Sequence, residues 1–197
     1  MNKLIENTNI YNMDNAIKQA KYPMATDTGK LNDEVTKTID SLGMSGTGEG
    51  HDQFLSGITV GFDLTCTIKM WTEIERYKFI NFVSSQSTMH RITKFDIREQ
   101  CIEYTDKAII EIVKLKIDRY NRLVDKKADP DVLKKLYLEI LYSVPVGFKL
   151  TAGLITNYRQ LKTIYKQRKT HRLPEWRAFC EWCTTLPNSH WITGEAA

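Results

Sequence analysis

The stretch PVGFKLTAGLITNYRQLKTIYKQRKTHRLPEW, residues 145–176, holds the clearest strand-to-helix transition in this sequence of 197 residues. Residues 146–154 alternate between apolar and small or polar side chains, and this period of two predicts a strand with one buried face. After Asn157, a preferred N-cap residue, the spacing becomes helical. The stretch therefore predicts a strand over 146–154 and a helix over roughly 158–169, and Pro174 is expected to begin a final helix.

A second strand-to-helix transition lies earlier in the sequence. Residues 57–66 alternate cleanly between apolar and polar side chains, which predicts another strand with one buried face. From Ile68 the apolar spacing becomes helical, and the helix is expected to break in the serine-rich turn SSQST, residues 84–88, because Ser and Thr favour caps and turns. Further helices are predicted over 105–124 and from the Asp129-Pro130 pair. The predicted fold class is α/β (α+β), with a mixed central sheet flanked by helices.

The first part of the chain is polar and weakly periodic. Residues 1–49 are predicted to form an N-terminal extension with one helix over 31–42 and a glycine-rich loop, GMSGTGEG, at 43–50. The loop lacks the GK[ST] ending of a phosphate-binding P-loop, so we interpret it as a flexible connection. Residues 50–197 then form the main domain.

Composition narrows the function classes. The net charge of +4 is mild, and a duplex-binding protein would more often carry a dense basic stripe, so no nucleic-acid partner is expected. No apolar run approaches the ~20 residues of a membrane span, and the N-terminus lacks the apolar stretch of a secretory signal. We therefore expect a cytoplasmic protein without a membrane partner.

The four cysteines allow two interpretations. Cys180 and Cys183 form a CxxC, which could be half of a zinc site. A second pair at metal spacing is absent from the sequence, so free structural thiols are the preferred interpretation for all four, which include Cys66 and Cys101.

Basic residues follow the helix predicted after Asn157. Arg168 lies nine residues after Arg159, which places the two side chains about 180° apart on a helix. They cannot serve one face of one pocket within a single subunit. Either one of them lies on a solvated helix face, or two subunits share the helix.

The serine-rich turn offers hydroxyl and backbone N–H groups that suit a phosphate monoester, with His90 and Arg91 close by. An ordinary polar loop is the alternative. His51 follows a glycine and precedes the first strand, where a lone histidine is either structural or functional.

Taken together, these segments resemble the flavin-dependent thymidylate synthases, which share a thymidylate synthase-complementing-protein-like fold. In that family a Gly-His precedes the first core strand, a motif RHRxxSxNExSxR follows, and later come a Pro, a strand and an N-x-R-S-L helix that ends in Arg. The matching positions here are Gly50-His51, Arg76-Tyr77-Lys78, Pro145, Asn157, Arg159, Leu161 and Arg168, followed by HRLPEW where the family has a tail like HAQWEI. The resemblance covers 50–91 and 145–176.

The resemblance implies a function and a set of site residues. It implies reductive methylation of dUMP, or a related pyrimidine nucleotide, with FAD, NADPH and methylene-tetrahydrofolate, in a homotetramer whose active sites lie between subunits. The residues implied to contact FAD are His51, Arg76, Lys78, Asn157, His171 and Arg172. The residues implied to hold the nucleotide are Ser84, Ser85, Gln86, Ser87, Arg91 and Arg168. Arg159 and Arg168 are the candidate catalytic residues.

This sequence departs from the family motif at several places. RHR has become Arg76-Tyr77-Lys78, the motif serine is Asn81, and the Asn-Glu is Val83-Ser84. The family arginine about two turns before Pro145, which polarises the uracil, is missing from LYLEIL. The alternative hypothesis is therefore a catalytically eroded relative that acts as a nucleotide-binding or protein-interaction module.

Overall fold

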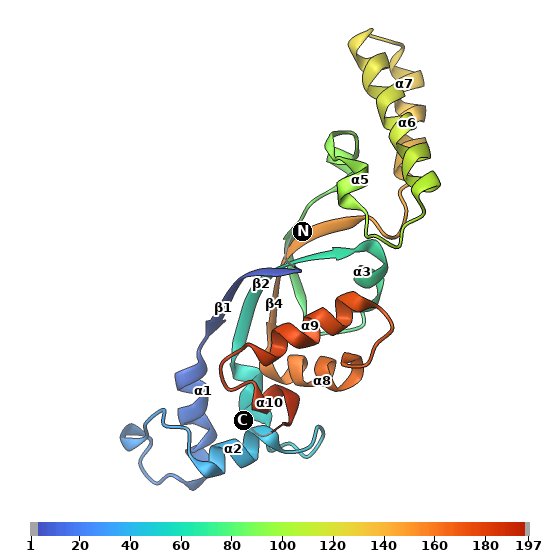
Figure 1. The fold of residues 1–197 in the computed structure, drawn as a ribbon. Helices are drawn as coiled ribbons and strands as arrows, with labels where there is room; N and C mark the ends of the chain where they lie inside the picture. The colour runs from blue at the N-terminus through green and yellow to red at the C-terminus, as the bar shows by residue number, and fades with distance from the viewer. Residues whose placement is uncertain (1–3, 196–197) are drawn as a thin grey trace. The chain divides into compact units, whose positions relative to one another are not determined.

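A computed structural model describes residues 4–195 (Figure 1). The strands are β1 (Ile5–Tyr11), β2 (Thr59–Thr67), β3 (Asn81–Ser85) and β4 (Lys149–Asn157). The α-helices are α1 (Met13–Ala20), α2 (Lys37–Met44), α3 (Ile68–Ile74), α4 (Thr88–Arg91), α5 (Ile97–Gln100), α6 (Lys107–Asp125), α7 (Pro130–Leu141), α8 (Tyr158–Arg168), α9 (Pro174–Thr184) and α10 (His190–Thr193). Short 3-10 helices are η1 (Tyr22–Met24), η2 (Thr28–Lys30), η3 (Gln53–Gly57) and η4 (Ile92–Lys94).

The strands form one antiparallel sheet in the order β1-β2-β4-β3, and helices flank it. The α/β fold class predicted from the sequence is confirmed. In β2, Val60, Phe62, Leu64 and Cys66 are buried and alternate with less buried residues, as the period of two predicts. Strand β4 also alternates, but it begins at Lys149 rather than at Val146, which is exposed at 62%. A turn closed by a hydrogen bond from the Phe148 N–H to the Pro145 carbonyl, 2.9 Å, precedes the strand.

The helix expected from Ile68 to the serine-rich turn was predicted too long. It ends at Ile74, and tight turns over 75–80 lead into β3. The Tyr77 N–H donates to the Ile74 carbonyl at 2.9 Å, and the Ile80 N–H donates to the Tyr77 carbonyl at 3.1 Å. Strand β3 was missed because all five of its residues are exposed, so burial imposes no alternation on the sequence.

The first fifty residues contain more structure than the single helix expected. Strand β1 pairs with β2 and has an irregular register between Glu6 and Asn9, where Asn7 adopts a φ of 52°. The predicted helix begins at Lys37 rather than at Leu31, because the Thr36 hydroxyl accepts from the Ile39 N–H at 3.4 Å and caps it.

The last helix, α10, packs against α2. A Cβ on Gly43 would lie 2.5 Å from the indole of Trp191, so this helix contact requires glycine. Asp40 of α2 accepts hydrogen bonds from the ring nitrogens of His190, 2.8 Å, and Trp191, 3.0 Å. The bond from His190 is the main cause that lowers the pKa of the Asp40 carboxyl, while partial burial opposes it.

The chain divides into two compact units. Among the described residues, the first comprises 4–64, 74–83 and 153–195, and the second comprises 65–73 and 84–152. In the first unit α8 and α9 lie side by side (Figure 1). Asn157 caps α8 by accepting from the Gln160 N–H at 2.9 Å, and Pro174 begins α9, as predicted. The buried apolar residues of this unit include Ile58, Val60, Phe62, Leu154, Leu161, Ile164, Trp176 and Phe179.

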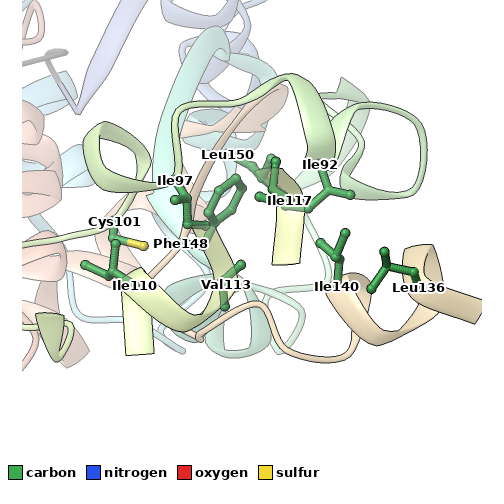
Figure 2. Packing of buried hydrophobic residues seen from close by; sticks show 10 residues of the cluster. All are labelled: Ile92, Ile97, Cys101, Ile110, Val113, Ile117, Leu136, Ile140, Phe148 and Leu150. Carbon is green, nitrogen blue, oxygen red and sulfur yellow. The ribbon is translucent and has the colours of Figure 1, made fainter. Parts of the chain in front are cut away.

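The second unit is built around the antiparallel pair α6 and α7. Asp129 caps α7 as predicted, and its carboxylate accepts from the Asp131 N–H at 2.8 Å. Figure 2 shows the core of this unit, and its residues are Ile92, Ile97, Cys101, Ile110, Val113, Ile117, Leu136, Ile140, Phe148 and Leu150. Ile109 of α6 is 46% exposed, and the buried face of this helix is formed by Ile110, Val113 and Ile117.

All four cysteines are buried. Burial raises the pKa of Cys180 to about 11 and raises that of Cys183 well above its usual value, which disfavours the thiolate that zinc requires. Within residues 4–195, no group of three or more His, Cys, Asp and Glu side chains could hold a metal ion. Over the same residues, no helix has the length and apolar character of a membrane span.

Candidate functional site

A buried carboxylate organises the N-terminal half of α8. Asp52 is completely buried, and its two oxygens accept from Arg159 Nε at 3.0 Å and from Lys162 Nζ at 3.1 Å. Arg159 Nη1 also donates to the side-chain oxygen of Gln53 at 2.6 Å. Buried charges must be paired, so this cluster fixes η3 against α8.

Lys162 also holds the glycine-rich loop. Its ammonium donates to the backbone carbonyls of Gly43, 2.8 Å, and Ser45, 2.5 Å. The loop beyond these carbonyls turns through Gly48 and Gly50, whose φ values of +103° and +83° favour glycine. The loop is thus anchored at its first end to the helix that carries Arg159.

Two adjoining hollows run along α8, and we call them together the α8 groove. The larger, of about 640 Å³, is lined by Thr47, Gly48, Gln53, Ser56, Phe79, Asn157, Arg159, Gln160 and Thr163. The smaller, of about 320 Å³, is lined by Arg76, Tyr77, Lys78, Phe79, Gln160, Thr163 and Gln167. Phe79, Gln160 and Thr163 belong to both, so the two hollows share a wall.

Four of the residues predicted to contact FAD or to catalyse lie on this groove, although they come from two distant segments. Arg76 and Lys78 are exposed on the turn before β3, while Tyr77 between them is buried. Asn157 and Arg159 begin α8 on the other hollow. The groove therefore combines cationic groups, amide and hydroxyl groups, and the 64% exposed ring of Phe79. Such a set suits a flat aromatic ligand that carries phosphates.

His51 lies beside the groove rather than on it. It lines a separate hollow of about 450 Å³, which shares Gln53 and Ser56 with the larger part of the α8 groove. Its side chain is exposed.

Arg168 and His171 belong to a buried cluster at the other end of α8. Arg168 is 7% exposed, and its Nε donates to the Tyr77 hydroxyl at 2.7 Å. Its Nη1 lies 2.8 Å from His171 Nε2, and the guanidinium lies 4.6 Å from the ring centre of Trp176. The Tyr77 hydroxyl in turn donates to Gln167 at 3.1 Å. Arg172 is exposed beside this cluster.

The predicted phosphate-binding residues of the serine-rich turn lie in the second unit. Ser84, Ser85, Gln86 and Arg91 are exposed, and Ser87 is half-buried at the start of α4. The Gln86 side-chain oxygen accepts from the Thr151 N–H at 2.9 Å, and the Gln86 N–H donates to the Thr151 carbonyl at 2.9 Å. Gln86 thus ties the turn to β4, and Ser84 and Ser85 before it are open to solvent.

Sequence reasoning missed Asp52, Gln53, Phe79 and Gln160. Asp52 stands directly after His51, but its partners Arg159 and Lys162 lie more than 100 residues away, and nothing in the local pattern pairs them. The exposed aromatic Phe79 was hidden in a segment interpreted as helix.

No family model matches this chain, and no curated relative matches it either. Solved structures match this chain. A flavin-dependent thymidylate synthase ThyX from Helicobacter pylori, complexed with FAD and dUMP, matches with a TM-score of 0.67 and 15% identity over 97% of each chain. The chain has the fold of the flavin-dependent thymidylate synthases.

Two further structures share this thymidylate synthase fold. A second structure of the Helicobacter pylori ThyX with FAD and dUMP gives a TM-score of 0.66 at 15% identity, over 96% of this chain and 98% of that chain. A UMP/dUMP methylase PolB from Streptomyces cacaoi, bound with 5-Br dUMP, gives a TM-score of 0.59 at 16% identity, over 95% and 92%. The resemblance found in the sequence is therefore confirmed as a likeness of the whole fold.

Proposed function

We propose that this protein binds FAD in the α8 groove and acts on dUMP or a related pyrimidine nucleotide. The observation that carries the proposal is the convergence of Arg76, Lys78, Asn157 and Arg159 on one groove. The likeness to structures that hold FAD and dUMP supports it. The proposed reaction is reductive methylation with methylene-tetrahydrofolate and NADPH.

The donor set of the groove fits FAD. Arg76 and Lys78 offer exposed positive charge for a pyrophosphate, and the ring of Phe79 offers an apolar surface for a flat ring system. Asn157, Gln160 and Thr163 supply donors and acceptors for the edges of that ring. Bound FAD would supply the hydride chemistry, and the protein would supply orientation and electrostatics.

The residues of this chain would then have distinct roles. Arg159 would present a fixed positive charge to the bound ring and stabilise negative charge that develops there, since Asp52 and Gln53 hold its guanidinium in place. Arg168 would act as a positioning residue, because it anchors Tyr77 between Arg76 and Lys78. His51, His171 and Arg172 would complete the surroundings of the cofactor.

The nucleotide phosphate is proposed to bind at the serine-rich turn. The hydroxyls of Ser84, Ser85 and Ser87 and the guanidinium of Arg91 provide donors for a phosphate monoester. The amide of Gln86 also lies on this turn.

Added FAD should make the purified protein yellow after removal of free flavin, and dUMP should perturb the bound flavin spectrum. Arg159→Ala should weaken FAD binding by roughly tenfold to a hundredfold, because a hydrogen bond from a charged group contributes about 1.5–3 kcal/mol. Absorption and flavin-fluorescence titrations measure both effects.

The matched control is Lys166→Ala, which removes an exposed charge of α8 that does not line the groove. If Arg159→Ala and Lys166→Ala bind FAD with equal affinity, the α8 groove is not the FAD site. A protein that binds dUMP but stays colourless with excess FAD would contradict the flavin reaction and favour the nucleotide-binding alternative.

A homotetramer is the proposed assembly. The sequence suggested it because Arg159 and Arg168 lie on opposite faces of α8, as if two subunits shared the helix. In the structure both side chains find partners within one chain. The edge strand β3, whose five residues are exposed and where Val83 reaches 66%, leaves a surface that a second copy could cover. Light scattering should report four chains per particle, and a monomer at micromolar concentration would contradict the proposal.

A further inference from the structure

A further hollow lies wholly within the second unit and shares no lining residue with the α8 groove. We call it the hairpin pocket, because it is formed by α4 and η4 on one side and by the α6–α7 hairpin on the other. Its volume is about 660 Å³, within the range of roughly 300–1,000 Å³ that small-molecule sites occupy. Nothing in the proposed flavin or nucleotide site accounts for it.

Aromatic and apolar groups make up the wall of the hairpin pocket. Tyr120 of α6 and Tyr137 of α7 lie with ring centres 5.3 Å apart and planes inclined at 59°. Both rings are half-buried, so part of each remains open to the pocket. Met89 and Leu133 add apolar surface. A planar ring would find both stacking and edge contacts here.

Positive charge surrounds this wall. Lys94 follows the buried Ile92 on η4 and Lys134 lies on α7, while the imidazole of His90 on α4 adds a polar group. Among the described residues that line the pocket, none is acidic. This lining favours a ligand that carries negative charge as well as a planar ring.

The pocket is formed before any ligand arrives. The Tyr137 hydroxyl donates to the Met89 carbonyl at 2.9 Å, and the Asn121 amide donates to the Thr93 carbonyl at 3.2 Å. These bonds join the hairpin to the opposite wall. Ile92, fully buried in the core shown in Figure 2, secures η4 against the same helices. A preorganised site loses little entropy when it binds.

We infer that the hairpin pocket binds a small aromatic anion, a planar ring that carries a phosphate or a carboxylate, with the ring against Tyr120 and Tyr137 and the anionic group between Lys94 and Lys134. The inference does not depend on the proposed flavin reaction, because no residue is shared between the two sites.

Calorimetric titration of the full chain with three probes tests the inference. Adenosine monophosphate and p-aminobenzoyl-glutamate should bind about tenfold more tightly than neutral adenosine at low salt, and the advantage should shrink as salt is added. The two anionic probes separate a phosphate ligand from a carboxylate ligand. Lys94→Gln and Lys134→Gln should each weaken the preferred anion by about two- to fivefold, the range of an exposed charge pair.

Lys135→Gln is the matched control, because Lys135 is the exposed neighbour of Lys134 on α7 and does not line the pocket. It should leave binding unchanged. The inference is overturned if no probe binds, if adenosine binds as well as the anions, or if Lys134→Gln and Lys135→Gln bind equally. An anion held in the α8 groove instead would give that last result.

Discussion

Replacing Asp52 with alanine should lower the free energy of unfolding by about 3–5 kcal/mol, because removal of one partner from a buried ion pair leaves the others uncompensated. Lys162 keeps only 9% of its side chain exposed, so its ammonium could not recover full hydration. The side chain of Arg159 is 32% exposed, so its guanidinium would lose less hydration than the Lys162 ammonium. Urea unfolding at neutral pH, followed by circular dichroism, measures the change.

The matched control is Asp33→Ala. Asp33 is exposed between η2 and α2 and has no hydrogen bond or ion pair among the described residues, so its loss should change stability by less than about 0.5 kcal/mol. Asp52→Asn keeps the shape but not the charge and should fall between the two. If Asp52→Ala proves no less stable than Asp33→Ala, the carboxylate does not hold η3 against α8.

The sequence predicts those elements whose residues repeat a burial pattern or a cap. Strand β4 and helix α8 were found because alternating burial runs into an N-cap at Asn157, and α7 was found because Asp129 and Pro130 mark its start. Strands β1 and β3 show no such pattern. Only Ile5 of β1 is buried, and no residue of β3 is, so their pairing depends on backbone hydrogen bonds that every residue type except proline can form.

In the candidate site, too, part could be predicted from the sequence and part could not. Arg76, Lys78, Asn157 and Arg159 could be named from the sequence because each occupies a position of a known motif. Their arrangement could not, because the carboxylate of Asp52 that orients Arg159 is a tertiary contact between residues 107 positions apart. Lys162 shows why neighbouring residues alone do not predict the site. Its charge suggests a solvated side chain on α8, but the side chain is buried and its ammonium donates to Asp52.

The sequence-based interpretation gives Arg168 a contact with the bound nucleotide, and the structure adds contacts within the chain. Its guanidinium is buried, donates to Tyr77 and stacks over Trp176. Replacing it with alanine should therefore lower the free energy of unfolding by about 2–4 kcal/mol, from a lost charged hydrogen bond and a desolvated cation–π contact. Arg168→Lys should recover only part of this, because an ammonium cannot reproduce a planar fork.

Lys166→Ala is the control for this change, since Lys166 is an exposed residue two positions earlier on the same helix. Lys162 also lies on this helix, but it is unsuitable as a control because its side chain is buried and paired with Asp52. Denaturant unfolding and FAD titration should be measured on the same samples. The positioning role of Arg168 predicts that stability and FAD affinity fall together, because Tyr77 sits between Arg76 and Lys78 and loses its anchor. Arg168→Ala with wild-type stability but a dUMP affinity lowered tenfold would show instead that the guanidinium turns outward to the nucleotide.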